Sequence, residues 1–403
     1  MYFGNYAVFL LFLIFQSSHP KMEVVFLLGS VQAFFLSFLV FNKKGKSHSE
    51  IILGTWLALL GLHILYYYLF TTGFLFRYPH LLGITAAFPM LEAPLMYIYV
   101  LVTISRKGRF RAVYLLNALP FLIFTIYFSF TFYFLSGPEK ISYYEQMYIK
   151  LPRDLAIMSF PDIAMGPIYV ILSLIALSQH SKNIAQRFSY TEQISLNWLK
   201  YVIGGLGFVF FTDVVSNILV KFPFMSVEAH EHLNYLSMTV AVFFLGFFGI
   251  RQQAISNVEV ASSHTNAMDV SRKKKGHGNQ YLHSGLKKEE AEQHAIALKA
   301  YFKNEKPYLN GKLSLSEVAE YMEISVNHLS QVINDQLGFS FFDFVNSYRV
   351  EEVKAKLADS AYENYTLLGM AYDSGFNSKS TFNSIFKKFT GFTPSQFASR
   401  KTD

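Results

Sequence analysis

The chain has 403 residues, enough for two or three domains, and 52% of them are hydrophobic and 17% aromatic. With a mean hydropathy of +0.26, this composition is too apolar for an ordinary water-soluble protein and indicates that much of the chain lies in lipid. The formal net charge is +7, and the absence of cysteine excludes a disulfide framework, a thiolate zinc site and a cysteine nucleophile.

The first expected element lies in residues 1–21, where an apolar stretch runs over 2–15. At about fourteen residues it is short for a membrane span and better sized for the core of a signal peptide, but it lacks the usual basic flank. Three interpretations stay open: an atypical cleaved signal, an additional membrane-associated helix, or an upstream extension with the working start at Met22.

Residues 22–250 are predicted to form a seven-helix transmembrane region, because seven apolar stretches of about 18 to 25 residues could each cross a hydrocarbon core of roughly 30 Å. The predicted spans are 24–41, 51–70, 81–104, 113–135, 161–177, 199–220 and 233–250. Basic loops alternate with loops of mixed charge, and basic loops are retained inside. The chain therefore is expected to cross the membrane with its first span starting outside and its last span ending in the cytoplasm at Arg251.

Polar side chains inside these spans are candidates for sensing a signal. They are Glu92, Asp162, Asp213 and Asn217. Intramembrane acids are costly and usually face partners or water, so Glu92 and Asp213 are expected either to line a ligand- or proton-sensitive cavity or to make interhelical hydrogen bonds only. His63 is interpreted as a packing residue.

Residues 251–290 are predicted to be a cytoplasmic linker, because the apolar pattern gives way to polar residues and to the basic run 272–275. This run could touch anionic lipid headgroups or DNA phosphates, or it could be part of a solvated tether.

Residues 291–403 are predicted to form a helical domain with two helix-turn-helix units. In the first unit Ser314 and Glu317 have the spacing of a capping box, Ser325 caps a second helix, and Gly338 ends the unit. The outer face of the second helix carries side chains that can hydrogen-bond base edges in a major groove, or that simply form a polar surface. These side chains are Asn327, His328, Gln331 and Asn334.

A long helix over 341–358 is predicted to join the two units. In the second unit Thr366 and Ser378 cap the two helices, Gly375 forms the turn between them, and Gly391 ends the unit before a final helix at Thr393-Pro394. The outer face of its second helix carries Lys379, Ser380, Asn383, Ser384 and Lys387. Two such helices on one stiff connector can read two major-groove segments about a helical turn, roughly 34 Å, apart.

Residues 310–400 resemble the DNA-binding domain of the AraC/XylS family of bacterial transcription regulators. The resemblance rests on the stretch NSYRVEEVKAKL at 346–357 and on the family-signature positions Ala371, Gly375, Phe376, Ser378, Phe382, Phe386, Lys387, Lys388, Gly391 and Pro394. By position it implies base or phosphate contacts from Asn327, His328, Gln331, Lys379, Ser380 and Asn383. The chain departs from the family at Ser384, where Arg is frequent, and at Phe397-Ala398, where Tyr-Arg is usual. The apolar half resembles that of a subgroup in which a multi-span region replaces the soluble sugar-binding domain.

The charge balance tempers this interpretation, because residues 291–403 hold 12 Lys and Arg against 13 Asp and Glu. Nonspecific affinity depends largely on phosphate neutralisation and should be modest for one copy. Dimerisation or the basic linker would then assist, and a degenerate domain that has lost DNA binding is an alternative. Only the end of the domain is cationic, through Lys379, Lys387, Lys388, Arg400 and Lys401.

The chain is not expected to be an enzyme, because it contains no HExxH, GxSxG or glycine-rich phosphate motif, and neither a cofactor nor a metal is expected. His230 and His232 could bind a metal only with further ligands. The sequence predicts an all-α, signal-responsive, membrane-anchored regulator of transcription, acting on promoter DNA as a homodimer with RNA polymerase and an unidentified small-molecule or membrane signal as partners. The alternatives are a membrane receptor whose C-terminal domain binds a protein, and an intramembrane hydrolase using Asp213 and Glu92.

Overall fold

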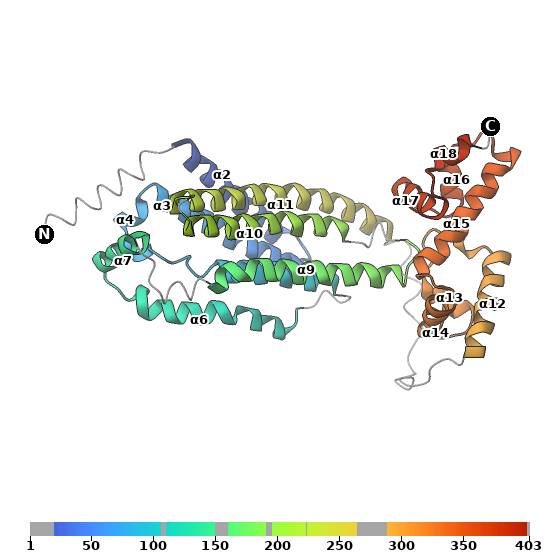
Figure 1. Ribbon diagram of the computed structural model, residues 1–403, viewed down its shortest axis with the longest axis horizontal. Coiled ribbons are helices and arrows are strands. Elements are labelled where there is room, and N and C mark those ends of the chain that lie inside the picture. Colours follow the sequence, from blue (N-terminus) through green and yellow to red (C-terminus); the bar gives the residue numbers. More distant parts are fainter. Residues whose placement is uncertain are drawn as a thin grey trace. The chain divides into compact units, whose positions relative to one another are not determined.

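The computed structural model describes residues 20–105, 110–149, 160–190, 196–222, 224–263 and 288–400 (Figure 1). Within these ranges all regular secondary structure is helical, and a single isolated bridge pairs Phe188 with Ser314. The prediction of an all-α chain is confirmed for this part. The apolar stretch 2–15 and the basic run 272–275 lie outside the described residues.

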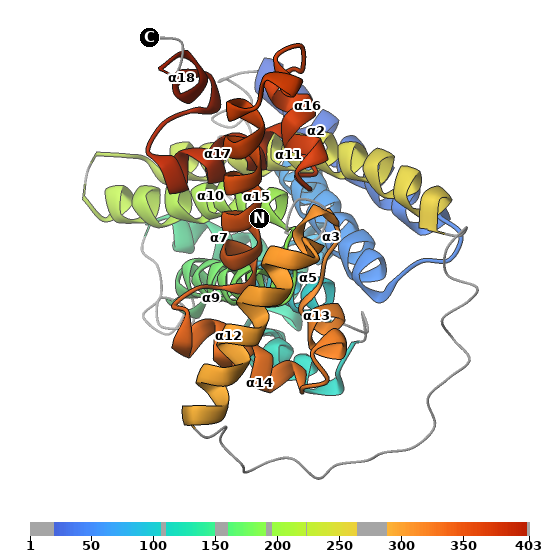
Figure 2. The ribbon, with the colours of Figure 1, turned by 90° about the vertical axis from the view of Figure 1, so that its right-hand side faces the viewer.

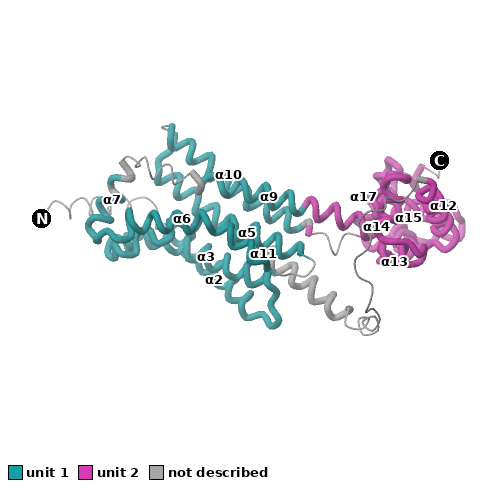
Figure 3. The backbone as a smooth tube through the Cα atoms, turned by 90° about the horizontal axis from the view of Figure 1, so that it is seen from below, with its two compact units in different colours: residues 1–177, 197–272 teal, residues 178–196, 273–403 magenta. Residues whose placement is uncertain are grey.

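The chain divides into two compact units (Figure 3). The first consists of residues 1–177 and 197–272, and the second of residues 178–196 and 273–403. The second unit thus contains a short piece of chain that precedes the predicted DNA-binding domain by about a hundred residues, as the two ranges show.

The first unit is a set of apolar helices. They are α2 (Pro20–Asn42), α3 (His48–Thr71), α4 (Phe74–Arg77), η1 (Pro79–Leu81), α5 (Pro89–Ile104), η2 (Ala112–Ala118), α6 (Leu119–Phe128), η3 (Ser129–Tyr133), α7 (Gly137–Ile149), α9 (Phe160–Ala185), α10 (Asn197–Lys221) and α11 (Val227–Ser263). Helix α9 has its last residues, from Ser178, in the second unit.

Helices α2 and α3 pack closely through small residues. The Ser30 hydroxyl donates to the carbonyl oxygen of Gly61 at 3.0 Å, and Ser37 donates in the same way to Gly54 at 2.8 Å. A Cβ atom on Gly61 would lie only 3.2 Å from that of Ala33. Small residues that bring backbones together and exchange hydrogen bonds are typical of helix pairs in lipid.

Five helical stretches among the described residues are long and apolar enough to cross a membrane. They are Met22–Asn42, His48–Thr71, Ala112–Tyr133, Ile163–Ala185 and Trp198–Lys221. These correspond to the predicted first, second, fourth, fifth and sixth spans. The described residues thus contain five such helices, while the bundle of seven spans stays a prediction.

The two remaining predicted spans differ from the structure. The helix within 81–104 begins only at Pro89, because the preceding residues form turns around Gly83, which has a φ of 81°. The resulting α5 has 16 residues, short for a span. Helix α11 continues to Ser263, past Ile250, so residues that were predicted to begin the linker are helical.

The second unit contains the tandem helix-turn-helix domain (Figure 2). Its elements are α12 (Lys288–Asn304), η4 (Pro307–Leu309), α13 (Leu315–Tyr321), α14 (Val326–Gln331), η5 (Val332–Gln336), α15 (Phe341–Ala358), η6 (Ser360–Tyr362), α16 (Leu367–Asp373), α17 (Lys379–Thr390) and α18 (Pro394–Ser399). Helix α15 runs between the α13 and α14 pair and the α16 and α17 pair in Figures 1 and 2. Each pair has its own core, built around Phe302, Leu329 and Phe344 in the first and around Phe376, Phe382 and Phe386 in the second.

Candidate DNA-binding surface and polar cluster

The helices of both helix-turn-helix units begin at the predicted capping residues. Ser314 and Glu317 exchange the two hydrogen bonds of a capping box, and the Ser325 hydroxyl accepts from the backbone N–H of His328 at 3.1 Å. In the second unit Thr366 and Ser378 accept in the same way at the starts of α16 and α17. Each cap satisfies a backbone donor that the helix itself leaves unpaired, so these local signals fix where the helices begin.

The turns of the two units have equivalent geometry but different residues. In the first, Glu323 has a φ of 56°, and in the second, Gly375 has a φ of 90°. Glu323 lies four positions after Ala319, and Gly375 lies four positions after Ala371. In each turn the alanine carbonyl accepts, at 3.1 Å, from the N–H of the residue that follows Glu323 or Gly375. Glycine is required at 375 for a second reason, because a Cβ atom there would lie 2.2 Å from the carbonyl oxygen of Tyr308.

The first recognition helix presents only part of its predicted face. Helix α14 is one and a half turns long and continues into the π-type turn η5. Asn327 is exposed, whereas His328, Gln331 and Asn334 are half-buried, and the Asn334 amide donates to the Ser330 hydroxyl at 3.2 Å. Asn327 is therefore the most accessible of the four predicted contacts.

The second recognition helix is longer and more open. Lys379, Ser380, Asn383, Ser384 and Lys387 are all exposed on α17, while Phe382, Ile385 and Phe386 are buried beneath them. This amphipathic pattern holds the polar face outward, as a helix that enters a major groove requires.

Lys388 differs from the other predicted contacts. Its Nζ donates to Asp343 Oδ1 at 2.6 Å, which ties α17 to the start of the long helix α15. The signature position therefore has an architectural role in this structure.

Sequence reasoning missed the role of Arg349. At 2% exposure it is the most buried charged side chain among the described residues of the second compact unit. Its guanidinium donates to the carbonyl oxygens of Tyr308 at 2.8 Å and Asn310 at 2.8 Å, and to Asn346 Oδ1 at 3.1 Å. A Cβ atom on Gly375 would lie 2.9 Å from its Nε. Arg349 therefore lies where α15, the start of the first helix-turn-helix unit and the turn of the second helix-turn-helix unit meet. An arginine within the apolar stripe of α15 was the available signal.

A separate polar cluster lies within the first compact unit, among the apolar helices. His63 Nδ1 and Glu92 Oε1 are 2.7 Å apart, and the Tyr235 hydroxyl is 3.0 Å from His63 Nε2. The ring of Tyr67 stacks on Tyr235 with 3.8 Å between centroids, and its hydroxyl is 3.1 Å from His232 Nδ1. His63 is buried, and both of its ring nitrogens have hydrogen-bonding partners, so it joins the polar cluster as well as the helix packing.

Asp213 belongs to the same region, because it and Glu92 line one cavity of about 80 Å³. Asp213 accepts from the Asn234 amide at 3.0 Å. Trp56 also lines the cavity and is 2% exposed, and among the described residues its indole N–H has no hydrogen-bond acceptor. The cavity thus has room for water or a small polar group and holds a donor able to bind it.

Asn217 is next to this region through His230, whose Nε2 is 3.9 Å from Asp213 Oδ1. Asn217 Nδ2 is 3.4 Å from His230 Nε2, and His230 Nδ1 is 2.7 Å from the Ser216 hydroxyl. His230 and His232 therefore have different partners, and the part of the chain that the structure describes contains no group of three or more potential metal ligands. Asp162 lies on α9.

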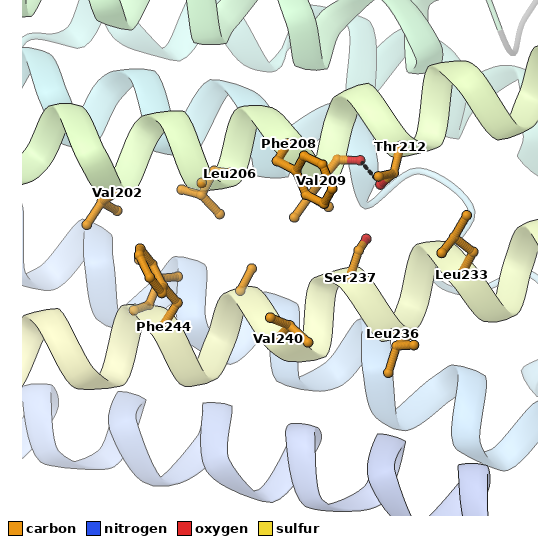
Figure 4. Close-up of a pocket in the computed structure, with 13 residues that line it drawn as sticks. Val202, Leu206, Phe208, Val209, Thr212, Leu233, Leu236, Ser237, Val240 and Phe244 are labelled. Carbon is orange, nitrogen blue, oxygen red and sulfur yellow. Dashed lines mark hydrogen bonds between the residues drawn. The ribbon is translucent and has the colours of Figure 1, made fainter.

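An apolar groove of about 420 Å³ lies between α10 and α11, shown in Figure 4. Apart from Thr212 and Ser237, its lining side chains are hydrocarbon or glycine. Both hydroxyls donate to carbonyls of their own helices, Thr212 to Val209 at 2.7 Å and Ser237 to Asn234 at 2.7 Å. The groove therefore presents hydrocarbon and suits contact with lipid chains.

Comparison with known proteins agrees with the geometry of the second unit. Residues 318–400 match the family model described as a helix-turn-helix domain, which is of the AraC type. Over 85 residues the chain is 40% identical to an uncharacterized HTH-type transcriptional regulator of Staphylococcus aureus (strain COL) and 27% identical to the melibiose operon regulatory protein of Escherichia coli (strain K12). The alignments span 21% of this chain, 11% of the staphylococcal protein and 27% of the melibiose regulator. No solved structure matches the chain.

The C-terminal domain is therefore an AraC-type helix-turn-helix domain, and the resemblance found in its sequence is confirmed. This family is non-enzymatic, which agrees with the conclusion drawn from the missing enzyme motifs.

Proposed function

We propose that this protein is a membrane-anchored, sequence-specific DNA-binding regulator of transcription. The observation that carries the proposal is the presence, in one chain, of two recognition helices and of five helices apolar enough to span a bilayer. The polar face of α17 is exposed throughout, and α14 exposes Asn327. Because basic loops alternate along the apolar half, the topology proposed is multi-pass in the inner membrane with the helix-turn-helix domain in the cytoplasm.

Base contacts are assigned first to Asn327 of α14 and to Lys379, Ser380 and Asn383 of α17, whose side chains are exposed. His328, Gln331 and Asn334 are half-buried, so they are assigned a secondary role in the first half-site. Amide side chains can read adenine edges and lysines can read guanine or bind phosphate, so the two faces together can supply sequence preference and affinity.

Signal sensing is assigned to the cavity next to the His63 and Glu92 pair. Buried ionisable groups in a lipid-embedded bundle are costly. Here two acids, a histidine and an indole N–H that has no acceptor among the described residues gather around one small space. A polar ligand or a change in protonation there would alter contacts among α3, α5, α10 and α11. Asn217 and Asp162 are retained as secondary candidates.

A homodimer is proposed because the domain has balanced charge and one copy has few cations for phosphate neutralisation. Two copies would double the phosphate contacts. RNA polymerase is the expected partner at the promoter.

The direct test uses the full chain reconstituted in lipid nanodiscs and random-sequence duplexes. We expect selection of a defined sequence and an affinity that falls steeply as salt rises. The double variant Asn327→Ala with Gln331→Ala should change preference in one half-site and Asn383→Ala in the other, by roughly 1–3 kcal/mol each. The exposed Glu363→Ala serves as a matched control on the same domain.

Binding without any sequence preference would refute the proposal and favour the competing class, a receptor whose C-terminal domain binds a protein. The topology has its own test. In inverted membrane vesicles, added protease should remove the C-terminal domain, and in intact spheroplasts it should not.

Sensing is tested with Glu92→Gln and Asp213→Asn in cells that carry a reporter behind the selected sequence. Both variants keep the shape of the side chain and remove its charge, so reporter output should change while the protein level does not. Unchanged output for both would remove this cavity from the mechanism.

A further inference from the structure

The connection between α9 and α10 is built into the helix-turn-helix domain. Residues 178–196, which comprise the end of α9 and the connection to α10, belong to the second compact unit. Phe188 forms an antiparallel bridge with Ser314, the residue that caps α13. Ser189 is 1% exposed, so this piece of chain is an integral part of the domain.

The backbone contacts are those of a short two-stranded pairing. Ser189 N–H donates to the Leu313 carbonyl at 3.1 Å, and Leu315 N–H donates to the Arg187 carbonyl at 2.9 Å. The Ser189 hydroxyl also donates to the Leu313 carbonyl at 2.7 Å. Two backbone bonds flank Phe188 and Ser314, which makes these two residues a closely spaced, non-hydrogen-bonded pair.

The same segment completes the hydrogen bonding of Arg349. The Ser189 carbonyl accepts from Arg349 at 3.0 Å and from the Asn346 amide at 3.2 Å, and the Ser189 hydroxyl lies 3.2 Å from the second guanidinium nitrogen. Arg349 and Asn346 are 2% and 0% exposed. Arg349 also donates to the carbonyls of Tyr308 and Asn310. Its buried guanidinium therefore joins the segment to the start of the first helix-turn-helix unit and to the long connecting helix α15.

The second helix-turn-helix unit also contacts this region. The Asn377 amide donates to the Gly311 carbonyl at 2.6 Å, and the Gly375 turn lies against Arg349. The contacts around Arg349, to which Ser189 belongs, thus join the two helix-turn-helix units in addition to their packing on α15.

We propose that the α9–α10 connection is a docking segment, defined as Arg187–Ser189, through which helix α9 controls the spacing of the two recognition helices. The docked segment holds the domain in its DNA-reading arrangement. A displacement of α9 withdraws Ser189, leaves donors of Arg349 and Asn346 without their acceptor, and loosens that arrangement. This inference rests on the proposed function and adds the route by which the apolar half acts on the domain.

Docking is tested by a disulfide in the full chain, which has no native cysteine. Non-hydrogen-bonded antiparallel pairs have Cα atoms about 4.5 Å apart, within the range that a disulfide spans. Phe188→Cys with Ser314→Cys should cross-link in membranes. After cleavage at a protease site engineered within 264–287, the C-terminal domain should run with the membrane fragment on a denaturing gel unless reductant is added. Each single-cysteine variant should run as two separate fragments, and two fragments from the oxidant-treated double variant would overturn the proposal.

The consequence for DNA reading is tested with purified full-length chains in nanodiscs on the duplex selected by the wild type. Ser189→Pro removes one backbone donor and the hydroxyl, and it should weaken binding about tenfold or more. The exposed neighbour Gln186→Ala is the matched control and should bind as the wild type does. The Phe188→Cys and Ser314→Cys chain loses the Ser314 cap, so its reduced form is its own reference. The oxidised form, in which docking is locked, should bind at least as tightly as the reduced form.

Transmission is tested by inserting six Gly and Ser residues after Ala185, which leaves the segment intact but separates it from α9. The purified chain should keep its affinity, and promoter output in cells should change. Unchanged output, or a Ser189→Pro chain with a native protease pattern and wild-type affinity, would refute the route. If the wild type selects no duplex, the proposed function fails, while the disulfide still decides the docking.

Discussion

Arg349 donates a hydrogen bond to the carbonyl oxygen of Ser189, a residue 160 positions earlier in the chain, at 3.0 Å. A helix-turn-helix domain defined by sequence similarity alone, such as the matched residues 318–400, lacks this acceptor. The contact therefore shows that the folded domain is larger than its sequence signature.

It follows that a fragment of residues 288–403 should be less stable than a fusion in which residues 178–190 precede it through a flexible linker. Unsatisfied buried donors cost roughly 1–3 kcal/mol each, so we expect a difference of about 2 kcal/mol or more in the free energy of unfolding. Urea denaturation followed by circular dichroism measures it. The same fusion with Ser189→Pro is the control, and equal stability of all three proteins would contradict the expectation.

Gly375 and Gly391 provide a matched pair for the turn of the second unit. Both have positive φ, 90° and 79°, but a Cβ atom at 375 would meet the Tyr308 carbonyl at 2.2 Å, whereas one at 391 has nothing within 4 Å. Gly391→Ala should cost about 1 kcal/mol from backbone strain alone. Gly375→Ala should cost about 3 kcal/mol or more, because the turn must also move away from Tyr308. Hydrogen exchange of core peptides in the full chain reports both, and equal costs would show that the close approach does not matter.

Local signals in the sequence predicted the helix-turn-helix domain well. Caps such as Ser325 and Thr366 and the positive-φ glycines at 375 and 391 act within a few residues, so their geometry can be read without the rest of the fold. The pairing of Ser189 with Arg349 could not be read, because hydrogen bonds between distant residues leave no periodic pattern. The serine is one of many in a polar loop.

The apolar half shows the same division. Length and hydropathy found the long helices, but they did not reveal that the chain before Pro89 forms turns or that α6 continues into a π-type stretch at Ser129–Tyr133. The pairing of His63 with Glu92 also escaped, because the two residues lie on different helices and only packing brings them within 2.7 Å. Each residue could be noted as an ionisable group inside a predicted span, but the sequence did not show that the two would pair.

Glu352, on the long helix α15, makes the stability of the second compact unit depend on pH. Burial would raise the pKa of this carboxyl group, but hydrogen bonds from Lys306 and from the Tyr308 hydroxyl, both at 3.0 Å, and the charge of Lys306 lower it overall. A carboxyl group with a lowered folded-state pKa contributes stability above its unfolded pKa of about 4.3, and this stability is lost as pH falls through the folded pKa.

We therefore expect the free energy of unfolding to fall below about pH 4.3, and to fall less in Glu352→Gln, which titrates no proton at this site. Hydrogen exchange of peptides from α15 at several pH values measures the effect. Glu363→Gln, an exposed change in the same domain, is the comparison. A wild type and a Glu352→Gln chain with the same pH profile would assign the acid sensitivity to other groups.

Lys387 and Lys388 are neighbours on α17 with different expected roles. Lys387 is exposed on the proposed DNA-binding face, whereas Lys388 donates to Asp343 at 2.6 Å. Lys387→Ala should weaken binding similarly for all sequences and reduce the slope of log affinity against log salt by about 0.9, the amount for one lost phosphate contact. Lys388→Ala should leave that slope unchanged and lower stability by about 1 kcal/mol or less, because the lysine of this pair is half-exposed. Salt titrations of duplex binding by the two full-length variants separate these effects. An equal loss of slope in Lys388→Ala would mean that Lys388 leaves Asp343 to bind phosphate when the domain meets DNA.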